Sequence, residues 1–382
     1  MTALATTLPP KPCDVPIDTG YLEKQVPGLT SDHMAYYLIN GLKDRVDPTP
    51  WFVTDWYAWQ NPDWHHAHRA PYLHYLQTGR FEGRDPSPYV DIYKYRHSVG
   101  AAVPVEAIYG LILKGHHCTA LGVTNPTTLR QQQAAFLDGI QSVAHRMRPL
   151  RKPRRGLVVL QAGRGSLAGR WFQDVGRDWD LLVNYYDAVG FRPGFGDYTC
   201  FQKGTKFTAM WHFLKQHAAL FRPYEHVLFL DDDVETSVRD LNRLFKTCRR
   251  HALDLAQMTL SADSSCNWPE LFHQPNQTGP RPVSAVEIMM PIFSQKALQQ
   301  IAPTLGQSVS GFGLDLVWGK CVADTGGKIA VLDDVVAAHR RPVDQSDGAY
   351  YSYLRSAGIN AKAELWALLN TYGAARDVVT QI

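Results

Sequence analysis

Two patterns of hydrophobic residues divide the chain. After about residue 156, short apolar runs without alternation end in polar residues, as expected of strands buried on both faces of a sheet. The clearest run covers residues 227–230 and is followed directly by Asp231, Asp232 and Asp233. Before residue 146 the apolar positions are largely aromatic and recur at a fixed spacing. The sequence therefore predicts an α/β domain that follows a helical repeat module.

The α/β pattern continues on both sides of the acidic run. Strands are predicted at residues 156–161, 180–187, 253–260, 328–332 and 335–338, and helices at 203–217 and 238–251. This order predicts a mostly parallel, Rossmann-type sheet with helices on both faces. Open sheets of this kind bind ligands at the carboxyl ends of their strands.

The N-terminal third contains an internal repeat. The motif Tyr-Leu-x-x-Gly followed by Asp-Pro-x-Pro occurs at residues 37–50 and again at 75–88, with a fainter third copy from residue 111. Each unit is predicted to form a short helix, a Pro-bounded turn and an aromatic helix, and such units stack on their neighbours. The predicted parts are a flexible arm (1–32), a helical repeat module (33–145), a basic linker (146–155), the α/β domain (156–345) and a C-terminal helical extension (346–382).

The aromatic residues of the repeat module have two interpretations. They would form its core, or, if exposed, they would stack on the sugar rings of a long acceptor, dock a partner protein or mediate oligomer formation. The residues concerned are Trp51, Trp56, Tyr57, Trp59 and Trp64. The histidine groups at 65–68 and 116–118 lack a complementary ligand pair at zinc-like spacing, which favours incidental surface histidines.

Composition narrows the class of protein. A hydrophobic content of 45% with 20% charged residues is typical of an ordinary globular protein, and a formal charge of +3 does not indicate nucleic acid. The six cysteines include no Cys-x-x-Cys pair, which favours a reducing compartment. Residues 1–16 have no apolar signal-peptide core, and no run approaches the ~20 apolar residues of a spanning helix. The sequence therefore predicts a cytoplasmic protein.

Two segments leave membrane contact open. Six basic residues lie between Arg146 and Arg155. They favour a solvated linker between the domains, and the alternative is a peripheral contact with an anionic inner leaflet. Nucleic acid is not expected, because no nucleic-acid motif accompanies them. Residues 361–372 predict an amphipathic helix that packs on the domain or lies on a membrane.

The three consecutive aspartates are the strongest chemical signal. Such a cluster repels itself and loses hydration when buried, so it favours a bound cation. Oxygen ligands at the end of a strand suit Mg²⁺ or Mn²⁺, usually shared with the phosphates of a substrate. The alternative is a loop with three solvated acids.

Other candidates lie at neighbouring strand and helix ends. The turn at Ala162 and Gly163 and the strand end at Tyr185 are predicted to hold the base and ribose of a nucleotide. Lys203 or Lys206, at a helix N-terminus, would neutralise phosphate, or would be a surface lysine. Glu287 is a lone carboxylate on an apolar segment and must be paired, exposed or functional.

Asp315 and His339 complete the candidate set. Asp315 follows two glycines and opens a predicted helix that also carries Trp318; its alternative role is a helix N-cap. His339 follows the last predicted strand, and its alternative role is a neutral core histidine.

These motifs, in this order, resemble the metal-dependent GT-A-fold glycosyltransferases. The run 231–233 matches the family's Asp-x-Asp, and residues 311–315 look like its Gly-Trp-Gly-x-acid segment, with Phe312 in place of Trp and a single acid. Residues 268–269, 287–294 and 312–315 are more closely similar to a plant and bacterial family catalogued as a domain of unknown function. This resemblance covers roughly residues 154–343.

The N-terminal module resembles a repeat found beside glycosyltransferase domains in bacterial surface-polysaccharide proteins. Residues 82–88, Glu-Gly-Arg-Asp-Pro-Ser-Pro, match it closely, and the first copy departs at residues 44–46.

The resemblance implies an activity and a role for each candidate. It implies transfer of a sugar from a nucleotide-diphosphate donor, with a UDP-sugar favoured, to a glycan or lipid-linked glycan, using Mn²⁺ or Mg²⁺ and inverting the anomeric carbon. Asp233, His339 and Asp231 would hold the metal, and Asp231 or Asp232 would meet the donor. Asp315 would be the catalytic base, and Trp268, Glu287 and Trp318 would bind the acceptor. A retaining transferase with the same metal site and a non-catalytic binding scaffold stay open as alternatives.

Overall fold

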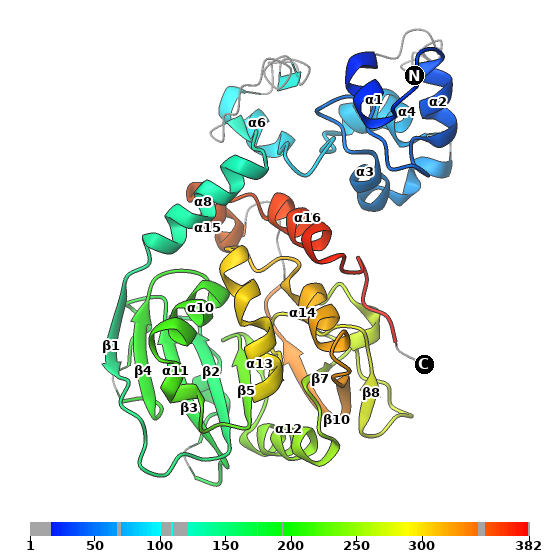
Figure 1. Ribbon diagram of the computed structural model, residues 1–382. Coiled ribbons are helices and arrows are strands. Elements are labelled where there is room, and N and C mark those ends of the chain that lie inside the picture. Colours follow the sequence, from blue (N-terminus) through cyan, green and yellow to red (C-terminus); the bar gives the residue numbers. More distant parts are fainter. Residues whose placement is uncertain are drawn as a thin grey trace, which may run out of the picture. The chain divides into compact units, whose positions relative to one another are not determined.

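The computed structural model describes residues 17–66, 70–100, 108–109, 121–173, 175–192, 194–342 and 348–380. The chain divides into two compact units, Met1–Leu129 and Arg130–Ile382 (Figure 1). The basic segment at 146–155, predicted to link the domains, therefore lies inside the second unit. Among the described residues, no helix has the length and apolar character needed to cross a membrane.

The first unit is built of short helices. They are α1 (Thr19–Gln25), α2 (His33–Asn40), α3 (Thr54–Gln60), the 3₁₀ helix η2 (Pro62–His66), α4 (Pro71–His74), the π-helical turn η3 (Tyr75–Gly79), α5 (Arg80–Glu82) and α6 (Ile92–Val99). The helix α1 lies in the segment that was predicted to be a flexible arm, so that prediction is wrong for residues 19–25.

The repeat is visible in its hydrogen bonds. Asp47 Oδ1 accepts the backbone N–H of Thr54 at 2.8 Å, and Asp85 Oδ1 accepts that of Ile92 at 2.8 Å. In each copy the aspartate of the Asp-Pro-x-Pro turn thus satisfies a free N–H in the first turn of the next helix. The motif therefore has a structural explanation.

The same geometry places α1 in the repeat. The N–H groups before α1, α3 and α6 each donate to a carbonyl of the following turn: Asp18 to Pro48 at 3.0 Å, Val53 to Pro86 at 3.1 Å and Asp91 to Gly122 at 2.8 Å. Four residues beyond these donors, Leu22, Tyr57 and Tyr95 are all buried. The repeat therefore starts about one helix earlier than the Tyr-Leu-x-x-Gly motif indicates.

Several aromatic residues of the first unit belong to its core. Trp51, Trp56 and Tyr57 are buried, and Trp51 stacks on Tyr109 with ring centroids 4.0 Å apart. Trp59 and Trp64 are partly exposed, while His65 and His66 are exposed. The remaining members of the two histidine groups, and the start of the third copy at residue 111, lie outside the described residues.

The second unit combines one sheet with flanking helices. Its strands are β1 (Ser142–Arg146), β2 (Gly156–Ala162), β3 (Trp179–Tyr185), β4 (Tyr198–Gln202), β5 (His226–Leu230), β6 (Val234–Glu235), β7 (Leu255–Leu260), β8 (Pro280–Pro282), β9 (Ile292–Ser294) and β10 (Ile329–His339). Its helices are α8 (Pro126–Asp138), which crosses the division between the units, α9 (Ala168–Trp171), α10 (Lys206–Gln216), α11 (Ala218–Phe221), α12 (Val238–His251), α13 (Gln295–Ile301), α14 (Leu314–Ala323), α15 (Ala349–Ser356) and α16 (Ala361–Tyr372), with 3₁₀ turns η5 (Pro269–Leu271) and η6 (Ala302–Gln307).

The sheet is mixed. Its strand order is β1-β4-β3-β2-β5-β9-β7-β10-β6, and β8 pairs with β10. The strands β4, β3, β2 and β5 are parallel, but β9 lies between β5 and β7 and is antiparallel to both. The strands β1, β6 and β8 are also antiparallel to their partners. The prediction of a mostly parallel sheet is therefore corrected, because these short strands and the three-residue strand β9 were not recognised in the sequence. The two strands predicted at 328–338 form one strand, β10, with a register irregularity between Leu332 and Val336.

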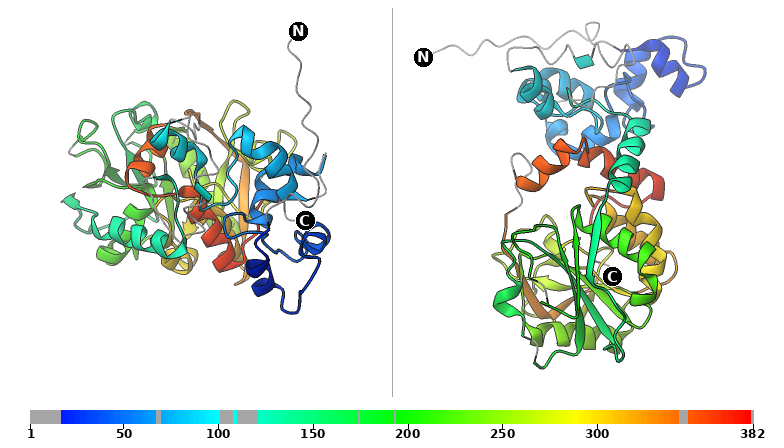
Figure 2. Two further views of the ribbon diagram at one scale, coloured as in Figure 1. Left: turned by 90° about the horizontal axis from the view of Figure 1, so that it is seen from above. Right: turned by 90° about the vertical axis from the view of Figure 1, so that its left-hand side faces the viewer.

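The C-terminal extension packs against the end of α8. Val309, Leu354 and Ile359 form a buried cluster, against which Phe136 and Ala361 are packed. Figures 1 and 2 show α8, α15 and α16 side by side at one end of the sheet. The helix predicted at 361–372 is present with those bounds, and it buries Leu368 and Leu369 as a packed helix should.

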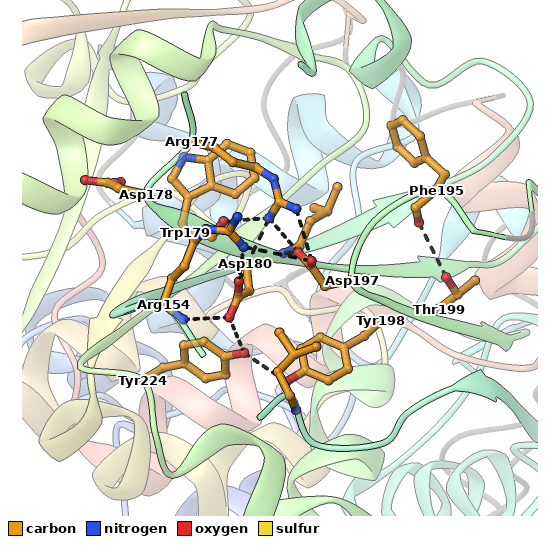
Figure 3. A network of polar contacts seen from close by, with 12 residues as sticks. Arg154, Arg177, Asp178, Trp179, Asp180, Phe195, Asp197, Tyr198, Thr199 and Tyr224 are labelled. Carbon is orange, nitrogen blue, oxygen red and sulfur yellow. Dashed lines mark hydrogen bonds and ion pairs between the residues drawn. The ribbon is translucent and has the colours of Figure 1, made fainter. Parts of the chain in front are cut away.

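A buried ion network ties the basic segment to the sheet (Figure 3). Asp180 in β3 is 0% exposed, and its Oδ1 accepts a hydrogen bond from the Arg154 guanidinium at 2.6 Å. Its Oδ2 accepts the backbone N–H of Arg154 at 2.9 Å and the hydroxyl of Tyr224 at 2.9 Å. Arg154 is therefore a structural residue of the second unit.

Replacing Asp180 by alanine will destabilise the second unit. The change leaves the Arg154 and Tyr224 donors without their buried acceptor, so we expect the free energy of unfolding to fall by about 3–5 kcal/mol. Urea denaturation of the full-length protein measures the change. Asp178→Ala is the matched control, since Asp178 is half-exposed and pairs with Arg249 at 3.6 Å, a contact worth at most about 1 kcal/mol. Equal losses in the two variants would contradict the structural role of the network.

Candidate active site

The acidic run lies where several strands end together. In the registers of the sheet, Leu160 of β2 is level with both Val183 of β3 and Leu230 of β5. The residues that follow β2, β3 and β5 therefore meet at one edge. The chain turns at once after Leu230, where the N–H of Asp231 donates to the carbonyl of Met289 at 2.9 Å.

Asp233 faces His339. The strand β6 pairs with the end of β10, with His339 opposite Val234, and this register brings His339 Nε2 to 3.4 Å from Asp233 Oδ2. The Nδ1–H of His339 donates to the carbonyl of Ser265 at 2.8 Å, which leaves Nε2 as the nitrogen available for ligation. Burial alone would lower the pKa of His339, but the hydrogen bond and charge of Asp233 raise it to about 9.

Asp232 is fully engaged by its surroundings. Its Oδ2 accepts the N–H of Gly163 at 2.8 Å and the hydroxyl of Tyr186 at 3.0 Å. Its Oδ1 lies 3.1 Å from the Arg341 guanidinium, which also donates to the carbonyl of Gly165 at 2.6 Å. Asp232 therefore holds the turn after β2 against the acidic run.

Asp231 turns to the opposite side. Its Oδ1 lies 3.0 Å from the ammonium of Lys206 at the start of α10. The same ammonium donates to the carbonyls of Ile288 and Met289, at 2.7 and 2.9 Å. Lys206 is thus committed to Asp231 and to the segment after Glu287.

Two further carboxylates face this region. Burial and the charge of Glu287 raise the pKa of Asp315 to about 7. The side chain of Trp268 acts in the opposite direction and lowers this pKa. Glu287 is held by its backbone N–H, which donates to Gln257 at 2.6 Å, and burial raises the pKa of its side chain. A carboxyl group with a pKa near 7 suits a general base that works near neutral pH.

Not every predicted residue reaches the site. Trp318 is 0% exposed and donates its indole N–H to Thr304 at 3.0 Å, so it is a core residue, which corrects its predicted acceptor role. Tyr185 is buried and donates to the carbonyl of Arg192 at 3.3 Å. Lys203 is exposed in the turn before α10. The carbonyl of Ala162 accepts the N–H of Tyr186 at 3.1 Å, and the N–H of Gly163 donates to Asp232, so the backbone turn at 162–163 does lie beside the acidic run.

Two site residues were missed from the sequence. Tyr186, next to the predicted Tyr185, points to the other side of the strand end because side chains alternate along a strand. Arg341 lies in the bend that follows β10, two residues after His339. The alternation of side chains along β3 was the signal that would have identified Tyr186, whereas Arg341 lies beyond the strand and carried no such signal.

The environment of Asp233 fits a divalent cation. Asp233 Oδ1 is buried without a hydrogen-bond partner, which is costly unless a cation or ligand satisfies it. Across the part of the chain that the structure describes, no three or more His, Cys, Asp or Glu side chains are grouped so that they could hold a metal ion alone. The predicted set of Asp231, Asp233 and His339 is not assembled, because Asp231 turns to Lys206. The pair Asp233 and His339 would hold an ion whose other ligands are substrate oxygens and water.

Comparisons with known proteins give a family match over part of the second unit and a similar solved structure. Residues 178–350 match a family described as a protein of unknown function (DUF707), in line with the resemblance noted from the sequence. No curated protein matches the chain. A solved structure titled "Crystal structure of GalNAc-T7 with UDP, GalNAc and Mn2+" is similar at a TM-score of 0.37 and 10% identity, over 54% of this chain and 48% of that one. The chain thus spans about half the length of that protein.

Binding of a divalent cation should release a proton. The pKa of His339 is about 9, so near neutral pH its imidazole is protonated and must lose that proton to ligate. We expect the affinity for Mn²⁺ to rise about tenfold per pH unit between about pH 6 and about pH 8. Calorimetry in buffers of different ionisation enthalpy counts the released protons. His339→Ala should lose the pH dependence of Mn²⁺ affinity, and His251→Ala, at an exposed position, is the control. Proton release that persists in His339→Ala would contradict the role of His339 as a metal ligand.

Proposed function

We propose that the second unit transfers a sugar from a nucleotide-diphosphate donor to a hydroxyl group of an acceptor, with the help of a divalent metal ion. The observation that carries this proposal is the meeting of Asp233 and His339 at the strand edge, with Asp233 Oδ1 buried and unpartnered. Asp315 then supplies a second, separate carboxyl group with a pKa near 7.

A divalent ion held by Asp233 and His339 would bind the diphosphate of the donor. Mn²⁺ and Mg²⁺ both suit the carboxylate, and the imidazole favours Mn²⁺ because Mg²⁺ binds mainly oxygen. When bound, such an ion offsets the negative charge that develops on the leaving diphosphate. Arg341 lies beside the same aspartates and adds a fixed positive charge.

The nucleotide would lie over the ends of β2 and β3. The turn at Ala162 and Gly163 and the ring of Tyr186 form this edge, and a Cβ at Gly163 would lie only 2.4 Å from that ring. Glycine at this position leaves room for the Tyr186 ring to pack on the turn, and this partly exposed ring would offer a flat face to the base. We favour a UDP-sugar as the donor.

Asp315 would act as the catalytic base. It removes the proton of the acceptor hydroxyl as that oxygen bonds to the anomeric carbon, while the bond from this carbon to the phosphate oxygen breaks. Positioned bases of this kind contribute about 10²–10⁴-fold. Trp268, whose side chain influences the pKa of Asp315, is partly exposed and would offer an apolar face to a sugar ring, and Glu287 would accept acceptor hydroxyls.

The setting we propose is bacterial surface-polysaccharide synthesis, at the cytoplasmic face of the membrane. The repeat motif at residues 82–88 supports it by its resemblance to repeats that accompany such enzymes. The exposed basic residues Arg146, Arg148, Arg151 and Lys152 suit a peripheral contact with anionic lipid. The acceptor would then be a glycan or a lipid-linked glycan.

Replacing Asp233 by asparagine should abolish metal-dependent turnover. The change removes the charge of one of two protein ligands, so we expect donor hydrolysis and transfer to fall by on the order of 10²–10³-fold. Nucleotide release from UDP-sugars with and without Mn²⁺ measures the effect. Asp324→Asn removes an exposed charge and serves as the matched control. Undiminished, metal-dependent turnover in Asp233→Asn would contradict the role of Asp233 as a metal ligand, whereas donor binding by the wild type without any turnover would favour the non-catalytic binding scaffold.

The pH profile of transfer should report Asp315. A base with a pKa of about 7 is ionised only at higher pH, so kcat/KM should rise with pH through about 7. Glu287→Gln removes the like charge that raises this pKa, so the rise should move to lower pH, whereas Asp315→Asn should abolish it.

Glu225→Gln, at an exposed position paired with Arg155, is the control for the loss of charge. NMR of the product's anomeric carbon completes the test: inversion is expected, and a retained configuration would exclude Asp315 as the base and favour the retaining transferase.

A further inference from the structure

The turn that precedes Asp315 has very little freedom. Gly311 and Gly313 adopt φ values of +79° and +80°, which side-chain-bearing residues rarely do. A Cβ would lie 2.7 Å from the Phe207 ring at the first position and 2.9 Å from Leu365 at the second. The turn at 308–313 is therefore closely surrounded by α10 on one side and α16 on the other.

A buried carboxylate from α16 holds this turn. Glu364 is 0% exposed, and it accepts the backbone N–H groups of Val309 at 2.9 Å and Ser310 at 2.7 Å. It also accepts the hydroxyl of Ser308 at 3.3 Å and the side-chain amide of Gln133 at 2.8 Å. The two consecutive N–H groups face one anion, as in the backbone nests that bind anions in other proteins.

Other contacts complete the arrangement. The hydroxyl of Tyr350 in α15 donates to the carbonyl of Ser310 at 2.7 Å. The amide of Gln133 in α8 donates to the carbonyl of Gln307 at 2.8 Å as well as to Glu364. The helices α8, α15 and α16 thus each bind polar groups of the turn. Asp315 follows Ser310 by five residues.

Stability alone does not account for Glu364. A buried carboxylate without a paired cation costs free energy, and well-packed apolar residues stabilise a protein at least as well. What the carboxylate supplies is a fixed acceptor for two adjacent N–H groups, which an apolar residue cannot provide. The geometry of the turn is therefore the property that depends on Glu364.

We propose that Glu364 is a positioning residue for the transfer reaction: it fixes the 308–313 turn and thereby holds Asp315 in the site. This inference rests on the proposed function. It gives the C-terminal extension a role in turnover although α16 itself carries no residue assigned to donor, metal or acceptor.

The test replaces Glu364 by glutamine in the full-length protein. The amide keeps the size of the side chain but has one acceptor oxygen for the two N–H groups. We expect kcat for transfer to fall by on the order of 10²-fold, with KM for the donor and metal-dependent donor hydrolysis little changed, because Asp233 and His339 are not affected. Amide hydrogen exchange at Val309 and Ser310 should become faster, while exchange in β2 and β5 stays slow.

The control is Asp377→Asn, which removes the same charge from an exposed position of the C-terminal extension. Unchanged kcat together with unchanged exchange at Val309 and Ser310 in Glu364→Gln would overturn the inference. Faster exchange with unchanged kcat would overturn the link to Asp315. If the wild type transfers no sugar, the proposed function fails, and hydrogen exchange still decides whether Glu364 holds the turn.

Discussion

The pairing of β6 with β10 is the interaction on which the site depends. β6 is only two residues long, and it continues the chain directly after the three aspartates. Its antiparallel register sets His339 opposite Val234, so the imidazole arrives beside Asp233 although the two residues are far apart in sequence. A slip of one residue would turn His339 to the other face of the sheet. The catalytic proposal therefore depends on a local strand pairing more than on the acidic run itself.

Around that pairing the site holds an excess of negative charge. Five carboxyl groups, those of Asp231, Asp232, Asp233, Glu287 and Asp315, meet the cations of Lys206, Arg341 and protonated His339. Lys206 and Arg341 each neutralise one aspartate, which leaves Asp233 with the imidazole and leaves Glu287 and Asp315 to repel each other. The same excess that raises the pKa of Asp315 also favours a divalent cation beside Asp233.

The sequence predicts the regular helices and strands of this structure. The predictions fail where contacts between distant segments determine which strands pair and which side chains are buried. The helices at 238–251 and 361–372 have their predicted bounds because amphipathic spacing and capping residues are local. The strand β9 was missed because three residues carry no period. Trp318 was misplaced because an aromatic residue on a helix suits a core as well as a binding face, and only its neighbours Phe207 and Phe293 decide. Lys206 could not be preferred to Lys203 without knowing that α10 starts at Lys206.

Buried or partly buried carboxylates have two distinct uses in this protein. Asp47, Asp85, Asp180, Asp232 and Glu364 each accept a backbone N–H from a segment outside their own element, and each thereby fixes a turn, a helix start or a strand start. Asp233 does not share this pattern, because its Oδ1 is buried without a partner. Asp315 accepts only the N–H of its neighbour Leu316 among backbone groups outside itself, at 3.0 Å. Within the described part of the chain, Asp231 and Glu287 also accept no distant backbone N–H, but Asp231 is paired with Lys206 at 3.0 Å and Glu287 accepts the N–H of Met289 at 3.3 Å. Asp233 and Asp315, to which we assign metal binding and proton removal, are thus released from the structural use of carboxylates and have, among the described residues, no lysine or arginine paired with them in the way that Lys206 is paired with Asp231.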